Sequence, residues 1–206
     1  MAVRKKAAVR EKARHSQPQF NFDFFVELLR HPKENFSKWK PHSDLWEAVK
    51  LVAAGFAIAG LIVVGKMGLQ GRMDAVSLIS LPLGYAISGV IITLIGVGIF
   101  YLLSILFGGK GEFKQQYYLS MLFVVPLAIF NSAVQIVPVL GNFLVALSNL
   151  YSLYLLTLVL MEVHGFSALR AVLIWLIPFI VLIIFIAAVL TAAVAVIIAR
   201  MAMLGG

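Results

Sequence analysis

Five long apolar stretches constrain this chain of 206 residues more than any other feature of its sequence. A helix that crosses a membrane needs about 20 mostly apolar residues. The sequence supplies such stretches at residues 49–68, 82–107, 117–137, 141–161 and 171–199. Hydrophobic residues make up 62% of the chain, against roughly 45–50% in soluble domains. We therefore expect an all-α, polytopic membrane bundle of five transmembrane helices, and a soluble domain is excluded.

The boundaries of these spans are predicted from capping and turn residues. No charged residue lies between Asp74 and Lys110, a segment too long for one upright helix. Residues 75–81 are therefore expected in the interface, with the second span from residue 82 and Pro82 at a helix start or a kink. A tight turn is predicted at residues 138–141, Pro-Val-Leu-Gly, between the third and fourth spans. Further predictions are Ser43 as the N-cap of the first span and Gly165 as the left-handed end of the fourth.

The distribution of basic residues predicts the orientation. Of the seventeen Lys and Arg residues, eleven lie in residues 1–50, and the loops on the same side carry Lys110, Lys114 and Arg170. The opposite side carries only Lys66, Arg72 and Arg200. Because Lys- and Arg-rich short loops stay in the cytoplasm, we expect a cytoplasmic N-terminus and an external C-terminus. The chain then divides into a basic cytoplasmic head, residues 1–48, and a five-span membrane domain, residues 49–206.

The head contains two distinct segments. Residues 1–14 carry six basic side chains and one acid, and each Lys or Arg near an anionic leaflet gains about 1 kcal/mol. Anionic lipid headgroups are therefore the expected partner, and nucleic acid is not, because the segment lacks interleaved aromatic residues. Residues 20–30 follow a helical period that places Phe24, Phe25, Leu28 and Leu29 on one face of an amphipathic helix. That face could lie in the headgroup boundary, pack under the bundle or dock a partner helix.

The residue types present argue against catalysis. The chain has no cysteine, so it has no thiolate nucleophile and no Cys-based metal site. Intramembrane enzymes and proton pumps keep ionisable residues at bilayer depth, and the cores of these spans contain none. We expect no enzyme activity, metal or cofactor. Glu162 and His164 are expected at a hydrated helix end, and with Lys110 and Lys114 they are candidate contacts of the cytoplasmic loops. The glycine-rich run at residues 108–111 lacks the Walker A spacing, so a flexible turn is expected there.

Uncharged polar residues on two spans form the other candidate site. Asn131 and Gln135 are four residues apart on the third span, and Ser148, Asn149 and Ser152 lie on one side of the fourth. These five residues predict either hydrogen bonds that fix the helix register or a small polar cavity near the middle of the membrane. Both interpretations remain open at this point.

Two ladders of small residues permit close helix packing. One, on the second span, consists of Ser80, Gly84 and Ser88; the other, on the fifth, consists of Ala187, Thr191, Ala195 and Ala199. Such ladders bring helix backbones together. They predict a tight bundle within one chain, or contact with a second copy or another membrane protein.

Five short motifs carry a resemblance to a known family. They are the segments at residues 30–36 (Arg-His-Pro-Lys-Glu-Asn-Phe), 108–115 (Gly-Gly-Lys-Gly-Glu-Phe-Lys-Gln) and 164–171 (His-Gly-Phe-Ser-Ala-Leu-Arg-Ala), together with Pro126 and the turn at 138–141. In this order and spacing, residues 28–199 resemble the prokaryotic branch of the Yip1-domain membrane proteins. The resemblance implies a five-span bundle with a cytoplasmic N-terminus, located in the prokaryotic plasma membrane.

The resemblance also bears on function. Eukaryotic members of the family are associated with Rab GTPases, vesicle formation and membrane shaping. Their acidic-Leu-Tyr-Gly-Pro motif is missing here, so Rab binding is not expected. The sequence leaves two hypotheses: a non-enzymatic scaffold that organises the membrane or recruits partners, and a small-solute or lipid-handling permease that uses the polar face between spans three and four.

Overall fold

The computed structural model describes residues 20–204, and every regular element in that range is helical. Two short helices, α2 (Phe22–Arg30) and α3 (Pro32–Trp39), precede a 3-10 turn, η1 (Lys40–His42). Five long helices follow: α4 (Leu45–Leu69), α5 (Ala75–Leu106), α6 (Phe113–Val134), α7 (Pro138–His164) and α8 (Ala168–Leu204). All five are long and apolar enough to cross a membrane, which confirms the all-α class and the five candidate spans. The basic segment 1–14 lies outside the described residues.

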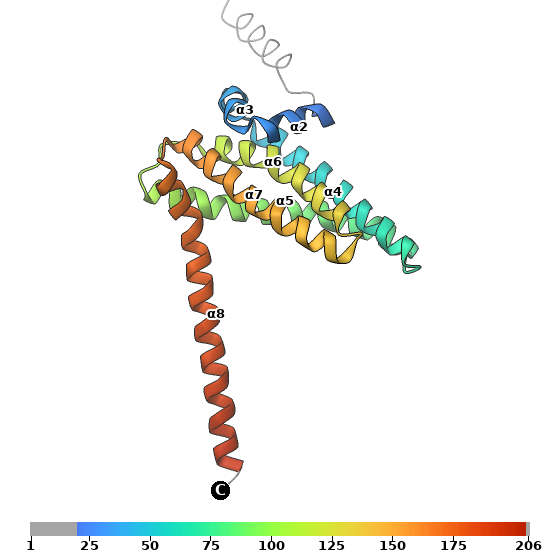
Figure 1. The fold of residues 1–206 in the computed structure, drawn as a ribbon, viewed down its shortest axis with the longest axis vertical. Coiled ribbons are helices and arrows are strands. Elements are labelled where there is room, and N and C mark those ends of the chain that lie inside the picture. The colour runs from blue at the N-terminus through green and yellow to red at the C-terminus, as the bar shows by residue number, and fades with distance from the viewer. Residues whose placement is uncertain (1–19, 205–206) are drawn as a thin grey trace, which may run out of the picture.

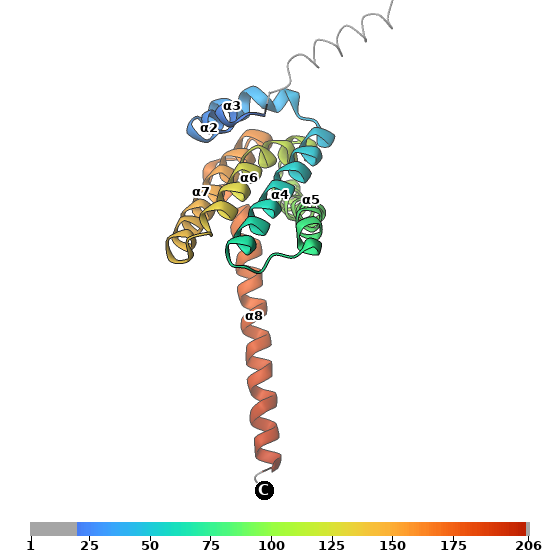
Figure 2. The same cartoon turned by 90° about the vertical axis from the view of Figure 1, so that its right-hand side faces the viewer.

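Helices α4 to α7 form the bundle, and α6 is its centre (Figures 1 and 2). Helix α6 packs against α4 on one side and α7 on the other, while α5 packs mainly against α4. The side chains of Tyr117, Tyr118, Leu119 and Leu122 on α6 are at most 1% exposed. Helices α2 and α3 lie over α6 and α7. We call these two helices and η1, residues 22–42, the cap.

Helix α8 leaves the bundle after its first turns and runs away from it in both views. Ala171 and Ile174 are fully buried, and the indole N–H of Trp175 donates to Thr157 Oγ1 on α7 at 2.9 Å. From Phe179 to Ala195 every described side chain is exposed. The ladder residues Ala187, Thr191 and Ala195 lie in this exposed part, so they do not serve close packing within the described chain. The other predicted role of the ladder, contact with a second copy or another membrane protein, stays a prediction.

Helix α5 begins seven residues before the predicted start of the second span. Asp74 Oδ1 accepts a hydrogen bond from the backbone N–H of Ser77 at 2.6 Å, and Ser77 Oγ accepts one from the Asp74 N–H at 3.2 Å. This capping box starts α5 at Ala75. Pro82 therefore lies inside α5, against the α4 backbone: a Cβ on Gly60 would lie 2.7 Å from Pro82 Cα. The prediction of a helix start at Pro82 is therefore wrong, while a kink at Pro82 and an interfacial position for residues 75–81 stay predictions.

Other helix ends differ by a few residues from the prediction. Asp44, rather than Ser43, caps α4, since its side chain accepts from the Glu47 N–H at 3.0 Å. Pro138 is not in the turn but in the first turn of α7, where its missing N–H costs nothing. Gly165 ends α7 in the left-handed conformation, with φ of 71°, as predicted.

Candidate functional site

The five polar residues predicted between α6 and α7 do not converge in the structure. Ser148 is buried and its hydroxyl has no partner, and the Asn131 Oδ1 is likewise buried without one. Gln135 and Asn149 are exposed. Ser152 Oγ donates to the Ser148 carbonyl within its own helix at 3.0 Å. Among residues 20–204, no hydrogen bond joins the side chains of any two of them.

The apolar face of α2 lies against the bundle. Leu28 is fully buried, while Phe24, Phe25 and Leu29 are partly buried. The ring of Phe24 meets that of Trp39 on α3 edge to face, with centroids 5.7 Å apart. The Tyr151 hydroxyl on α7 donates to the Leu29 carbonyl. The aromatic side of α2 is thus held down on α6 and α7.

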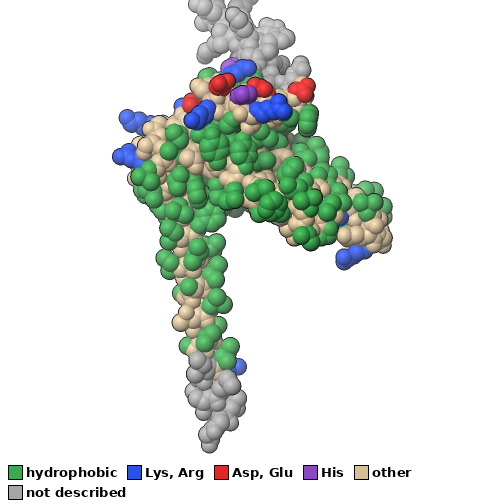
Figure 3. All heavy atoms as spheres, viewed as in Figure 1, with side chains coloured by type: hydrophobic (Ala, Val, Ile, Leu, Met, Phe, Trp, Pro, Cys, Tyr) green, Lys and Arg blue, Asp and Glu red, His purple; other side chains and the backbone are tan. Residues whose placement is uncertain are grey.

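The charged face of α2 points the other way. Its Asp23, Glu27 and Arg30 side chains are exposed. In Figure 3 charged and histidine side chains gather over the cap, while apolar side chains cover the flanks of the bundle and α8 below it. The cap is therefore a polar layer above largely apolar flanks.

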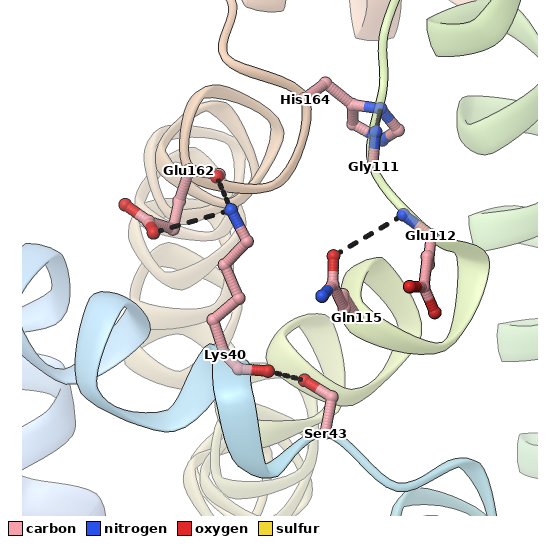
Figure 4. A network of polar contacts seen from close by, with 7 residues as sticks. All are labelled: Lys40, Ser43, Gly111, Glu112, Gln115, Glu162 and His164. Carbon is pink, nitrogen blue, oxygen red and sulfur yellow. Dashed lines mark hydrogen bonds and ion pairs between the residues drawn. The ribbon is translucent and has the colours of Figure 1, made fainter.

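A lysine connects the cap to the end of α7 (Figure 4). Lys40 Nζ donates to the Glu162 carbonyl and lies 3.7 Å from its carboxylate. Ser43 Oγ donates to the Lys40 carbonyl at 2.7 Å, which fixes the backbone from which the lysine extends. Both charged side chains are about one-third exposed, so the ion pair itself contributes roughly 0–1 kcal/mol. Its main effect is to position the cap on α7.

His164 is buried, so the expectation of a hydrated helix end is wrong for this residue. It is 6% exposed, and its ring stacks on that of Phe166 with centroids 5.4 Å apart. The backbone N–H of Gly111 donates to His164 Nδ1 at 3.2 Å. Since Nδ1 accepts, the proton lies on Nε2, which donates to Gln116 Oε1 at 2.8 Å. His164 therefore ties α7 to α6 and to the α5–α6 loop as a neutral imidazole.

Gln116 is the partner that the sequence reasoning missed. It is fully buried on α6, and its amide also donates to the Val97 carbonyl on α5 at 3.5 Å. A Gln directly before Tyr117 and Tyr118 was a signal, because a polar residue in a buried helix needs a partner. We call His164, Gln116 and Gly111 the histidine node.

The glycine-rich run at residues 108–111 is packed, contrary to the expected flexible turn. A Cβ on Gly109 would lie 2.6 Å from His164 Nδ1, and one on Gly111 would lie 2.2 Å from Val163 Cγ1. These two glycines let the loop approach the end of α7. Lys110 and Lys114 are exposed, and Lys114 pairs with Glu112 at 2.8 Å.

The polar groups of this site make contacts within the protein. Within residues 20–204 no three His, Cys, Asp or Glu side chains lie close enough to hold a metal ion. The ionisable groups that meet at the end of α7, Lys40, Glu162 and His164, are joined to one another or to the backbone. The arrangement holds the cap, the α5–α6 loop and α7 in one fixed relation.

Comparison with known proteins agrees with this architecture. Residues 26–190 match the family model of the Yip1 domain. Neither the curated proteins nor the solved structures contain a match to the chain. The matched region begins in α2, includes the whole α4–α7 bundle and the histidine node, and ends within α8. The chain is an integral membrane protein and belongs to the Yip1 domain family.

Proposed function

We propose that this protein is a non-catalytic membrane scaffold that shapes the bilayer by holding its cap in the cytoplasmic leaflet. In this proposal the N-terminus is cytoplasmic, the C-terminus is external, and the membrane is the prokaryotic plasma membrane. The basic segment 1–14 adds attraction to anionic headgroups. The observation that carries the proposal is the docking of α2 along α6 and α7, with its charged side chains directed away from the bundle.

The point of attachment of α2 matters for bilayer shape. Leu29 on α2 contacts Tyr151, which lies in the middle of α7 rather than at its end. Helix α2, with its charged face, can lie in the membrane interface beside the middle of α7 only if α7 is tilted away from the membrane normal. Material inserted into one leaflet alone expands that leaflet and favours curvature.

The lengths of the helices support such an inclination. Helix α7 has 27 residues and α5 has 32, which correspond to about 40 Å and 48 Å at 1.5 Å per residue. The hydrocarbon core is only about 30 Å thick. Helices of this length tilt or thicken the membrane around them, and a tilted bundle brings the cap toward the headgroups.

Labelling with a membrane-impermeant maleimide tests the orientation. The chain contains no cysteine, so a single cysteine at exposed Lys38 reports on the cap and one at exposed Gln70 on the opposite end of the bundle. In spheroplasts we expect labelling at position 70 only, and at position 38 only after the membrane is opened. Labelling of position 38 in unopened spheroplasts would refute the proposed orientation.

Reconstitution of the full chain into vesicles tests membrane shaping. We expect the wild-type protein to reduce vesicle diameter or to form tubules, as seen by cryo-electron microscopy. Leu28→Ala removes the fully buried anchor of α2 and should abolish this effect, whereas Leu150→Ala, on the exposed surface of α7, should leave it unchanged. Vesicles that keep the shape of protein-free ones with wild-type protein would overturn the scaffold proposal.

A permease has weaker support. Its predicted path needs Asn131, Gln135 and the polar residues of α7 to face one cavity, and Gln135 and Asn149 are exposed instead. The double variant Asn131→Leu with Gln135→Leu tests it directly. Solute uptake by the wild type that this variant loses would favour the permease over the scaffold.

A further inference from the structure

An apolar groove runs between the cap and the bundle. It has a volume of about 590 Å³, within the range of roughly 300–1,000 Å³ typical of small-molecule sites. Helix α2 contributes Phe25 and Leu29, and α6 contributes Pro126 and Phe130. From α7 the lining residues are Leu144, Leu147, Ser148 and Tyr151. We call it the α2 groove.

The walls of the α2 groove suit a hydrocarbon. Ten of the twelve lining side chains are apolar, and the two others are Ser148 and Tyr151. The Tyr151 hydroxyl is already used by the Leu29 carbonyl. The Ser148 hydroxyl is a single neutral group, 6% exposed as a residue and without a partner. The lining offers no charge to a polar solute or to an acidic or basic peptide.

The α2 groove is open on the side that faces the membrane. Residues at its rim are exposed: Phe22 by 80%, Phe130 by 42% and Leu147 by 47%. They belong to α2 and to two helices that are apolar and long enough to span the bilayer. Bilayer lipid is therefore the medium in direct contact with the opening.

The dimensions favour a thin occupant. Along α7 the lining residues run from Leu144 to Tyr151, a separation of seven residues or about 10 Å at 1.5 Å per residue. A helix with its side chains is about 10–12 Å across, so a helix of a second copy would need a longer trough with no helix above it. Here α2 forms one wall and limits the width of the groove. A single hydrocarbon chain is thin enough to occupy it.

We propose that the α2 groove binds one acyl chain of a bilayer glycerophospholipid. The acyl chain lies between α2 on one side and α6 and α7 on the other, and it fills the space that these helices leave open. Assigning the lipid to the cytoplasmic leaflet rests on the orientation given under the proposed function. The binding of an acyl chain in the groove does not depend on that orientation. Bound lipid would connect the cap to the membrane and stabilise its position.

Photo-cross-linking in nanodiscs tests this proposal. The probe is phosphatidylcholine with a diazirine in the middle of one acyl chain, incorporated with the full-length protein, and adducts are located by mass spectrometry. We expect adducts concentrated on groove residues such as Val26, Leu127 and Leu144. Leu147→Trp, at the rim, should reduce these adducts by roughly tenfold, equivalent to about 1.4 kcal/mol. Leu150→Trp is the matched control, because Leu150 is 65% exposed on the same helix and outside the groove.

Three outcomes would overturn the proposal. One is adducts spread evenly over exposed surfaces such as α8, and another is equal labelling of the Leu147→Trp and Leu150→Trp variants. The third is an efficient disulfide between two copies that carry Leu147→Cys, with no lipid adducts, since a second chain would then occupy the groove. If Leu147→Trp does not fold, Val26→Trp replaces it from the α2 side. Maleimide labelling tests the orientation separately, so adducts in the groove with an inverted cap would refute the proposed function and retain this inference.

Discussion

The histidine node provides a quantitative test of how the bundle is held together. Gln116→Met keeps the length of the side chain but removes the acceptor for His164 Nε2–H and the donor to the Val97 carbonyl. The bond to His164 is short, at 2.8 Å, and the one to Val97 is long, at 3.5 Å. The loss therefore comes mainly from the buried imidazole N–H left without a partner, which costs about 1–3 kcal/mol. We expect Gln116→Met to lower the free energy of unfolding by about 2 kcal/mol.

A double-mutant cycle separates this hydrogen bond from packing. His164→Phe keeps an aromatic ring beside Phe166 and removes both ring nitrogens. If the two residues interact as the structure shows, the double variant loses less than the sum of the single variants, with a coupling of about 1–2 kcal/mol. Reversible unfolding in mixed micelles, followed by circular dichroism, measures all four proteins.

The matched control is Gln135→Met, the same change at an exposed position. Its side chain makes no hydrogen bond to the rest of residues 20–204, since the contact of this residue with Lys66 uses its backbone carbonyl. We expect a change within about 0.5 kcal/mol. Equal effects of the changes at 116 and 135, or additive effects of the changes at 116 and 164, would show that the node does not hold the helices together.

Two further predictions concern the loops at opposite ends of the bundle. Gly111→Ala places a Cβ 2.2 Å from Val163 Cγ1 and should lower the unfolding free energy by about 1–3 kcal/mol, whereas Gly84→Ala, with open space around it, should be neutral or slightly stabilising; equal Tm values for the two variants would contradict the close approach. The Ser77 N–H and hydroxyl hold the pKa of Asp74 below its ordinary value of 3.8, so the contribution of this cap to stability is complete above that value and is lost as the pH falls through the lower folded-state pKa. The Tm difference between wild type and Asp74→Ala should therefore be present near neutral pH and disappear in strong acid, and a pH-independent difference would refute the role of the charge.

The sequence was sufficient to predict the five long helices, but not all of their ends and not their contacts. Apolar length predicted all five spans, and the local signal of Gly165 predicted the end of α7, because both depend on neighbouring residues. The contact between Gly111 and His164 joins residues 53 apart, and no periodicity encodes it. Residues 108–111 showed the same limit. Glycine serves both flexible loops and close backbone approaches, and only the position of Val163 beside Gly111 shows which applies here.

The course of α8 also depends on contacts with residues that are distant in the sequence. In water, a helix as apolar as α8 would be driven onto the bundle, but lipid tails are as apolar as its side chains and supply no such force. Its attachment must therefore come from specific contacts, and these lie near its start: buried Ala171 and Ile174, and the hydrogen bond from Trp175 to Thr157. Beyond Phe179 the described side chains of α8 are exposed, and no other described part of the protein covers them. Composition alone could predict that α8 crosses the membrane, whereas its departure from the bundle depends on where its few polar and close-packed contacts end.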